Sequence, residues 1–122
     1  MSFDEKPVRI DVVPKFKLTV DHSAHAVWVD HPTGSKVLNL TRMEFKLVDC
    51  MARHPGRMYE RDELIAYCCP ESETLHRTID SHMSNLRSEL AAAGARCLLV
   101  TVWGSGYKLD IETGVYFVSP RG

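Results

Sequence analysis

The feature that most constrains the fold is an apolar stripe between residues 75 and 93. Four large apolar side chains recur there at positions i, i+4, i+7 and i+11, the spacing of one face of an α-helix: Ile79, Met83, Leu86 and Leu90. Gly94 follows the stretch, where a helix commonly ends. The opposite face is predicted to be polar and rich in short hydroxyl side chains: Arg77, Asp80, Ser81, Ser84, Arg87 and Ser88. A long helix with one narrow apolar stripe needs other elements to cover that stripe.

Two shorter helices are predicted before it. Thr41 and Glu44 have the spacing of a capping box, in which each side chain binds the other residue's backbone amide. The helix that starts there carries apolar residues at helical spacing and ends at 54–56: Phe45, Val48, Met51 and Ala52. A second helix is predicted to open at 60–63 and to stop before Pro70.

Strands are predicted on both sides of the helices. Phe16, Leu18 and Val20 alternate with polar residues, which is the period of a half-buried strand. Further strands are expected at 26–29 and 37–40, with a turn at 31–35, and together they would form an antiparallel meander. A hairpin is expected at 98–102 and 107–109 around a glycine-containing turn, and one more strand is possible at 115–118.

This order of elements predicts an α+β winged helix-turn-helix domain: an N-terminal platform of antiparallel strands, three helices and a C-terminal β-hairpin wing. A short helix, a loop and a longer helix match the helix-turn-helix, whose last helix enters the DNA major groove. We expect the domain to span 15–110. Residues 1–14 are expected to be a linker or N-terminal tail, and 111–122 a C-terminal tail or extra strand.

Four blocks of this chain resemble the OmpR/PhoB family of response-regulator output domains. They are LTRMEFKLV at 40–48, HPGRMYERDEL at 54–64, RTIDSHMSNLR at 77–87 and TVWGSGYKL at 101–109. The resemblance implies sequence-specific binding to double-stranded DNA, with the helix at about 75–93 in the major groove and the wing at 98–109 on the backbone or minor groove. It also implies a homodimer on direct-repeat half-sites, and contact with RNA polymerase through the loop at 70–76.

The resemblance also implies particular DNA contacts. Phosphate contacts are implied for Arg77, Thr78, His82, Arg87, Thr101 and Tyr107. Ser84 and Asn85 occupy positions where some relatives carry arginines, and an asparagine suits adenine. Trp103 stands where other members place an arginine for the minor groove, so a core or sugar-packing role is an alternative for it. The remaining expected DNA-binding residues are Ser81, Ser105 and Gly106.

The charge balance limits how strongly a single domain can hold DNA. The chain has a net charge of −1, and between Leu40 and Asp110 nine Lys/Arg face ten Asp/Glu. Because phosphate neutralisation supplies most non-specific affinity, about four phosphate contacts per subunit would give a salt slope of roughly −3 to −4. We therefore expect modest affinity for one subunit and a dependence on paired sites.

Other classes of function have weaker support. Hairpin-end residues could be imagined as a metal site, but polar residues belong at such ends anyway: Asp21, His22, His25, Asp30 and His31. The adjacent Cys68 and Cys69 could sense oxidants, although buried structural thiols are the ordinary interpretation. The sequence has no nucleophile elbow, phosphate loop or zinc-protease motif. We expect no enzyme activity, cofactor or metal.

The surroundings of the domain follow from the same observations. No apolar run suggests a membrane span and the N-terminus does not resemble a signal peptide, so a cytoplasmic protein, nucleoid-associated when bound, is expected. Residues 1–14 cannot form the receiver domain that the family usually carries, which leaves an excised effector domain or a stand-alone regulator. A rival hypothesis is a winged-helix protein-interaction module with weak or no DNA binding, because the charge is near neutral.

Overall fold

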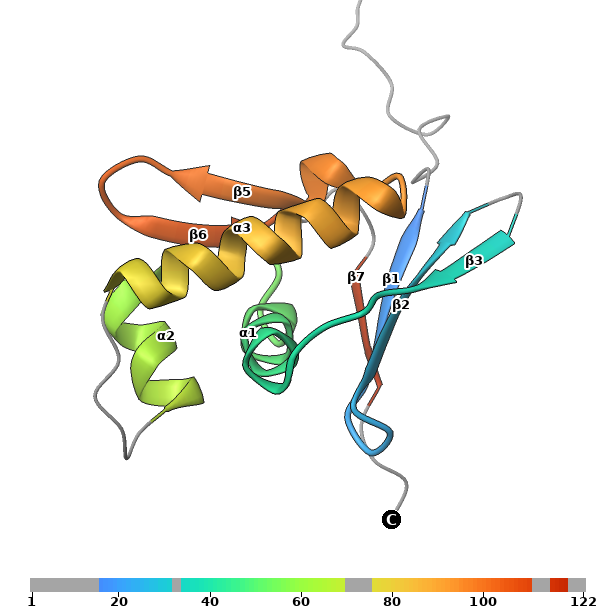
Figure 1. The fold of residues 1–122 in the computed structure, drawn as a ribbon, viewed down its shortest axis with the longest axis horizontal. Coiled ribbons are helices and arrows are strands. Elements are labelled where there is room, and N and C mark those ends of the chain that lie inside the picture. Colours follow the sequence, from blue (N-terminus) through green and yellow to red (C-terminus); the bar gives the residue numbers. More distant parts are fainter. Residues whose placement is uncertain (1–15, 32–33, 70–75, 111–114, 119–122) are drawn as a thin grey trace, which may run out of the picture.

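The computed structural model describes residues 16–31, 34–69, 76–110 and 115–118 of the 122-residue chain. Three helices pack against two sheets (Figure 1). The predicted N-terminal tail, residues 70–75 with Pro70, and the turn at 32–33 lie outside the described residues. Among the helices that are described, none is both long enough and apolar enough to cross a membrane.

The first sheet is the N-terminal platform, with strand order β3-β2-β1-β7. Strands β1 (Lys17–Asp21) and β2 (Ala26–His31) pair antiparallel, and β2 pairs in the same sense with β3 (Gly34–Val37). The meander is confirmed, but the third strand lies earlier than predicted. Residues 38–40 are not in a strand, because Leu38 leaves the sheet after one bond from its amide to the carbonyl of Val27 and turns inward.

The fourth strand of the platform comes from the other end of the chain. Strand β7 (Val115–Val118) occupies the range of the possible additional strand, and it pairs in parallel with β1. Figure 1 shows β7 beside β1, at the edge of the sheet opposite β3. The first and last described strands therefore belong to one sheet.

Helix α1 (Arg42–Ala52) begins as the capping box predicts. The Thr41 hydroxyl accepts from the Glu44 amide at 3.1 Å, and the Glu44 carboxylate accepts from the Thr41 amide at 3.0 Å. Helix α2 (Arg61–Cys68) starts at a second cap, in which the Glu63 carboxylate accepts from the Glu60 amide at 2.9 Å; the sequence does not predict it, because glutamate is an uncommon N-cap. The two-residue strand β4 (Tyr59–Glu60) precedes it and is too short to show an alternating pattern.

Helix α3 (His76–Ala92) carries the stripe that organises the core. All four predicted stripe residues are buried, and the two ends of the helix fit the prediction closely. Gly94 takes a φ of +79° directly after the helix, the left-handed conformation of a helix C-terminus. The stripe belongs to one buried core with apolar side chains of α1, α2, the platform and the wing sheet: Leu18, Val20, Phe45, Leu47, Met51, Leu64, Leu99 and Leu109.

The wing is a three-stranded antiparallel sheet in the order β4-β6-β5. Its hairpin consists of β5 (Leu99–Val102) and β6 (Gly106–Leu109), each within one residue of the predicted range. A short 3₁₀ turn, η2 (Arg96–Leu98), connects α3 to β5 and was not predicted. Figure 1 shows the hairpin running alongside α3, with its turn beyond the helix N-terminus.

Candidate nucleic-acid interface

Helix α3 presents an exposed face directly opposite its buried stripe. Arg77, Ser81, Ser84 and Ser88 are all exposed and follow one another at helical spacing along the whole length of the helix. Arg77 is the single cation among these four, and the described residues give it no hydrogen-bond or ion-pair partner. The other three are short serines that let another surface come close to the helix backbone. Thr78 lies half-buried at the edge of this face.

A buried carboxylate holds the flank of α3 that faces α1. Glu44 is 2% exposed and receives hydrogen bonds from α3 on both oxygens. Asn85 Nδ2 donates to Oε1 at 2.8 Å, and His82 Nδ1 lies 2.9 Å from Oε2. Burial raises the pKa of Glu44, but bonds from His82, the Thr41 amide and Asn85 lower it further, so it ends below its ordinary value. The capping box indicated Glu44, but not its second function of positioning two predicted DNA-binding residues.

The other flank of α3 is tied to the wing through Asp80. Its Oδ1 accepts from the Tyr107 hydroxyl at 2.7 Å and from Arg61 Nε at 2.8 Å. Burial and the bond to Asp80 raise the pKa of Tyr107. Burial also raises the pKa of Asp80, but the hydrogen bonds from Tyr107 and Arg61 lower it by more, so the pKa of Asp80 ends below its ordinary value. The sequence reading did not single out Arg61, and its charge here offsets that of Asp80 beside the exposed face.

Arg87 makes a second connection between α3 and the wing. Its Nη2 donates to the Thr101 hydroxyl at 2.7 Å and to the carbonyl of Leu99 at 3.2 Å, both on β5. Arg87 and Thr101 were both predicted as phosphate contacts, and the structure brings them together. Because Asp80 and Arg87 lie two turns apart on the same flank, the hairpin is held at two points along α3.

The wing turn combines an exposed side chain with a tightly packed strand start. Trp103 is 92% exposed, which excludes the core role considered for it. Gly104 has a φ of +75°, a conformation that favours glycine. Gly106 is buried, and a Cβ there would lie 1.9 Å from the Tyr59 carbonyl oxygen, so only glycine lets β6 pair with β4. Ser105 between them is half-buried.

Apart from Thr78 and Ser105, which are half-buried, the predicted site residues fall into three groups. Arg77, Ser81, Ser84 and Trp103 are exposed and carry no side-chain bond among the described residues. A second group is exposed or half-buried but bonded within the domain: His82, Asn85, Arg87 and Thr101. Tyr107 and Gly106 are buried, so their effect on this surface acts through the position of the wing.

The residues imagined as a metal site do not converge. Asp21 pairs with Ala26 at one end of the first hairpin, and Asp30 pairs with Lys17 at the other. His25 stacks on Phe45 at 4.9 Å, whereas His31 contacts the carbonyl of Ala93 after α3. Within the described ranges no three His, Cys, Asp or Glu side chains are grouped to hold a metal ion.

The cysteines lie mostly inside the core. Cys50, Cys68 and Cys69 are buried, and Cys97 is exposed. Burial raises the pKa of the Cys50 thiol to about 11 and that of Cys68 to about 12. A protonated buried thiol reacts slowly with oxidants, which favours the structural interpretation of Cys68.

A long exposed helix, a shorter helix before it and a hairpin along its flank define a winged helix-turn-helix protein. The comparison with family models matches residues 34–109 to "Transcriptional regulatory protein, C terminal". The chain belongs to this family of transcription regulators, which is not a family of enzymes. The resemblance drawn from the four sequence blocks is confirmed.

Individual relatives agree with the family. The chain is 30% identical over 117 residues to the transcriptional regulatory protein SrrA of Staphylococcus aureus, covering 88% of this chain and 44% of that protein. It therefore spans less than half the length of this curated relative. Among solved structures, the DNA-binding domain of the response regulator AdeR, in complex with an intercistronic region, is 36% identical with a TM-score of 0.70, covering 76% of this chain and 93% of that one.

A second structure supports the fold alone. The DNA-binding domain of Bacillus subtilis CssR is 24% identical, with a TM-score of 0.60, and the match covers 75% of this chain and 98% of that one. The α+β winged helix-turn-helix prediction is thus confirmed by the observed elements and by the neighbouring structures.

Proposed function

We propose that the domain binds double-stranded DNA sequence-specifically and regulates transcription, with α3 in the major groove and the hairpin on the backbone or minor groove. The observation that carries this proposal is the exposed face of α3, on which Arg77 is followed by three serines. Short side chains allow the helix to lie deep in a groove, and serine hydroxyls can donate to or accept from base edges. The similar DNA-binding domain of AdeR, which is in complex with an intercistronic region, supports the same ligand.

The contacts divide by chemistry. Arg77 and Thr78 at the start of α3, and Arg87 on α3 with its partner Thr101 on β5, are proposed to bind phosphates, which fix the register on the duplex. Ser84 and Asn85 are proposed to face bases. Asn85 gives one N–H to Glu44 and keeps a second N–H and its Oδ1, the pair of groups that a bidentate contact to adenine uses.

The wider assembly is also part of the proposal. Residues 15–110 would be the DNA-binding unit, acting as the output domain of a two-component response regulator in the cytoplasm, on the nucleoid when bound. Two subunits would occupy direct-repeat half-sites, because the near-neutral charge limits what one subunit can hold. The 70–76 loop would contact RNA polymerase. The family and its relatives favour DNA-binding transcription regulation over a protein-interaction module.

Fluorescence anisotropy with labelled genomic fragments tests the proposal at two salt concentrations. Wild-type protein is expected to bind at low salt and to lose affinity as salt increases. Arg77→Ala should weaken binding on all fragments and reduce the salt slope by about one, because it removes one phosphate contact. Arg87→Ala should also weaken binding, since it releases the wing as well as a cation.

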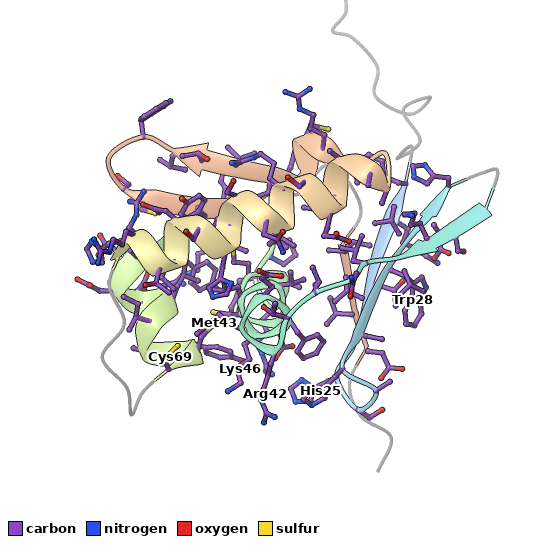
Figure 2. All side chains as sticks on the ribbon, in the orientation of Figure 1. His25, Trp28, Arg42, Met43, Lys46 and Cys69 are labelled. Atoms are coloured by element: carbon purple, nitrogen blue, oxygen red, sulfur yellow. The ribbon has the colours of Figure 1, made fainter. Side chains whose placement is uncertain are left out.

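The matched control is Arg42→Ala. Arg42 is also exposed, and Figure 2 shows it below α1, on the side away from α3 and the wing. Its removal changes the net charge equally and should leave the affinity within about twofold of wild type. The proposal fails if no fragment binds at low salt, or if Arg77→Ala and Arg42→Ala behave alike.

A further inference from the structure

The wing turn begins with a tryptophan, Trp103, whose indole packs on little of the domain. Trp103 is 92% exposed, the largest exposed apolar side chain among the described residues, whereas Trp28 on the platform is half-buried. Trp103 lies between Val102, the last residue of β5, and Gly104. A Cβ added to Gly104 would meet no atom beyond its chain neighbours within 4 Å, so the turn is open to solvent here. Trp103 therefore adds almost nothing to core packing, and nearly its whole indole surface is open to a binding partner.

The turn is held at a defined place beside the exposed face of α3. A shallow polar pocket is lined by the start of α2, the start of α3 and the wing turn: Glu60, Arg61, Asp62, His76, Gly104 and Ser105. The bonds Tyr107–Asp80 and Arg87–Thr101 fix the hairpin against the helix. The wing turn, which begins with Trp103, therefore lies near the N-terminal end of α3, on the surface proposed to meet DNA (Figure 1).

The turn lacks the charge that an ionic DNA contact needs. Residues 102–106 read Val-Trp-Gly-Ser-Gly, and the one cation of the hairpin strands, Lys108, pairs with Val100 away from the turn. Arg61, the nearest cation on α2, is committed to Asp80. The turn instead presents the flat apolar indole of Trp103, and the neighbouring glycines add no side chain beside it.

We infer that Trp103 is the wing's principal DNA contact and that it acts by apolar packing on the deoxyribose and base surfaces of the minor groove. Apolar side chains from minor-groove binders pack on and wedge between base steps. This inference rests on the proposed function and adds to it the physical nature of one contact. It assigns the wing a contribution that salt does not screen.

Salt dependence separates an apolar contact from an ionic one. Trp103→Ala should weaken binding to a labelled mixed-sequence duplex by about ten- to a hundredfold, and by the same factor at every salt concentration. Trp103→Arg should bind at low salt but show a salt slope steeper by about 0.9, because it adds one phosphate contact. Arg77→Ala, measured alongside, should flatten the slope, since its contact is ionic.

Fluorescence reports the contact directly. Trp28→Phe leaves Trp103 as the single tryptophan, because the chain has two. Its emission should be that of a water-exposed indole in the free protein, and should shift or be quenched when the duplex is added. Val37→Ala removes another exposed apolar side chain, on the platform strand β3, and should leave DNA affinity unchanged.

Each contrary outcome has a distinct meaning. The inference is overturned if Trp103→Ala binds within about twofold of wild type, or if its loss of affinity changes with salt. In either case wild type and Arg77→Ala can still behave as expected, and the proposed function stands. Failure of wild type to bind at low salt would overturn both. If Trp103→Ala instead abolishes self-association in sedimentation without DNA, Trp103 contacts a second copy and the inference is wrong.

Discussion

Glu44 offers a demanding test of how the domain holds its DNA-facing helix. It lies in the first turn of α1, is 2% exposed, and accepts three hydrogen bonds, from the Thr41 amide, Asn85 and His82 at 3.0, 2.8 and 2.9 Å. A hydrogen bond to a charged group contributes about 1.5–3 kcal/mol net, and such bonds are not additive.

Two substitutions separate the charge from the side-chain shape. We expect Glu44→Ala to lower the free energy of unfolding by about 2–3 kcal/mol, because it removes the shared acceptor of three hydrogen bonds, including the N-cap of α1. Glu44→Gln keeps one carbonyl oxygen for Thr41 and Asn85 and should cost about 1–2 kcal/mol. Glu89→Gln is the matched control. Glu89, on α3, accepts one hydrogen bond, from the backbone amide of Asn39, so this substitution should lower the free energy of unfolding by less than about 1 kcal/mol.

The pH dependence has a defined sign. The folded-state pKa of Glu44 is lowered from 4.5, so the unfolded chain binds the proton more readily. The stabilisation is therefore complete above about pH 4.5 and is lost as the pH falls through the lower, folded-state pKa. Urea denaturation at about pH 6 and about pH 3.5 should show the gap between wild type and Glu44→Gln narrowing in acid. Equal stability at the higher pH, or a gap that widens in acid, would refute this account.

Three further predictions follow from single contacts. Gly106→Ala should destabilise the domain by about 2 kcal/mol in urea denaturation, because its Cβ would lie 1.9 Å from a backbone oxygen of β4; a silent substitution would contradict the close approach. Asp80→Asn should lower the raised pKa of Tyr107 toward 10, seen as tyrosinate absorbance at lower pH, and no change would rule out the Asp80 contact as a cause. Deleting 115–122 should lower the free energy of unfolding by about 2 kcal/mol, since β1 loses the pairing of four residues; unchanged stability would argue against β7.

The elements that the sequence predicts well are those with long or redundant local signals. The stripe of α3 repeats over three turns, and the α1 capping box combines two reciprocal bonds with helical spacing behind it. The third strand was misplaced because Leu38 continues the apolar pattern of β3 although it has already left the sheet to join the core. Strand β4 and the parallel pairing of β7 depend on distant partners, which no local pattern encodes.

The candidate site divides in the same way. Exposure of Arg77, Ser81 and Ser84 follows from the helical period once the buried stripe is known. The bonds of His82 and Asn85 to Glu44 join residues 38 and 41 positions apart, so no spacing rule could reveal them. Trp103 shows the opposite case, because its residue type alone is compatible with a core role, and only its place in the turn makes it exposed.

The central claim is that duplex DNA contacts the exposed face of α3 and the wing turn. Backbone amide NMR shifts of the labelled protein, recorded as a duplex is added, test this most directly. We predict that the largest changes fall on Arg77, Ser81, Ser84 and Trp103, with little change on the outer strand β3 of the platform. Changes confined to the platform, or an unchanged α3 in the presence of saturating DNA, would contradict the account.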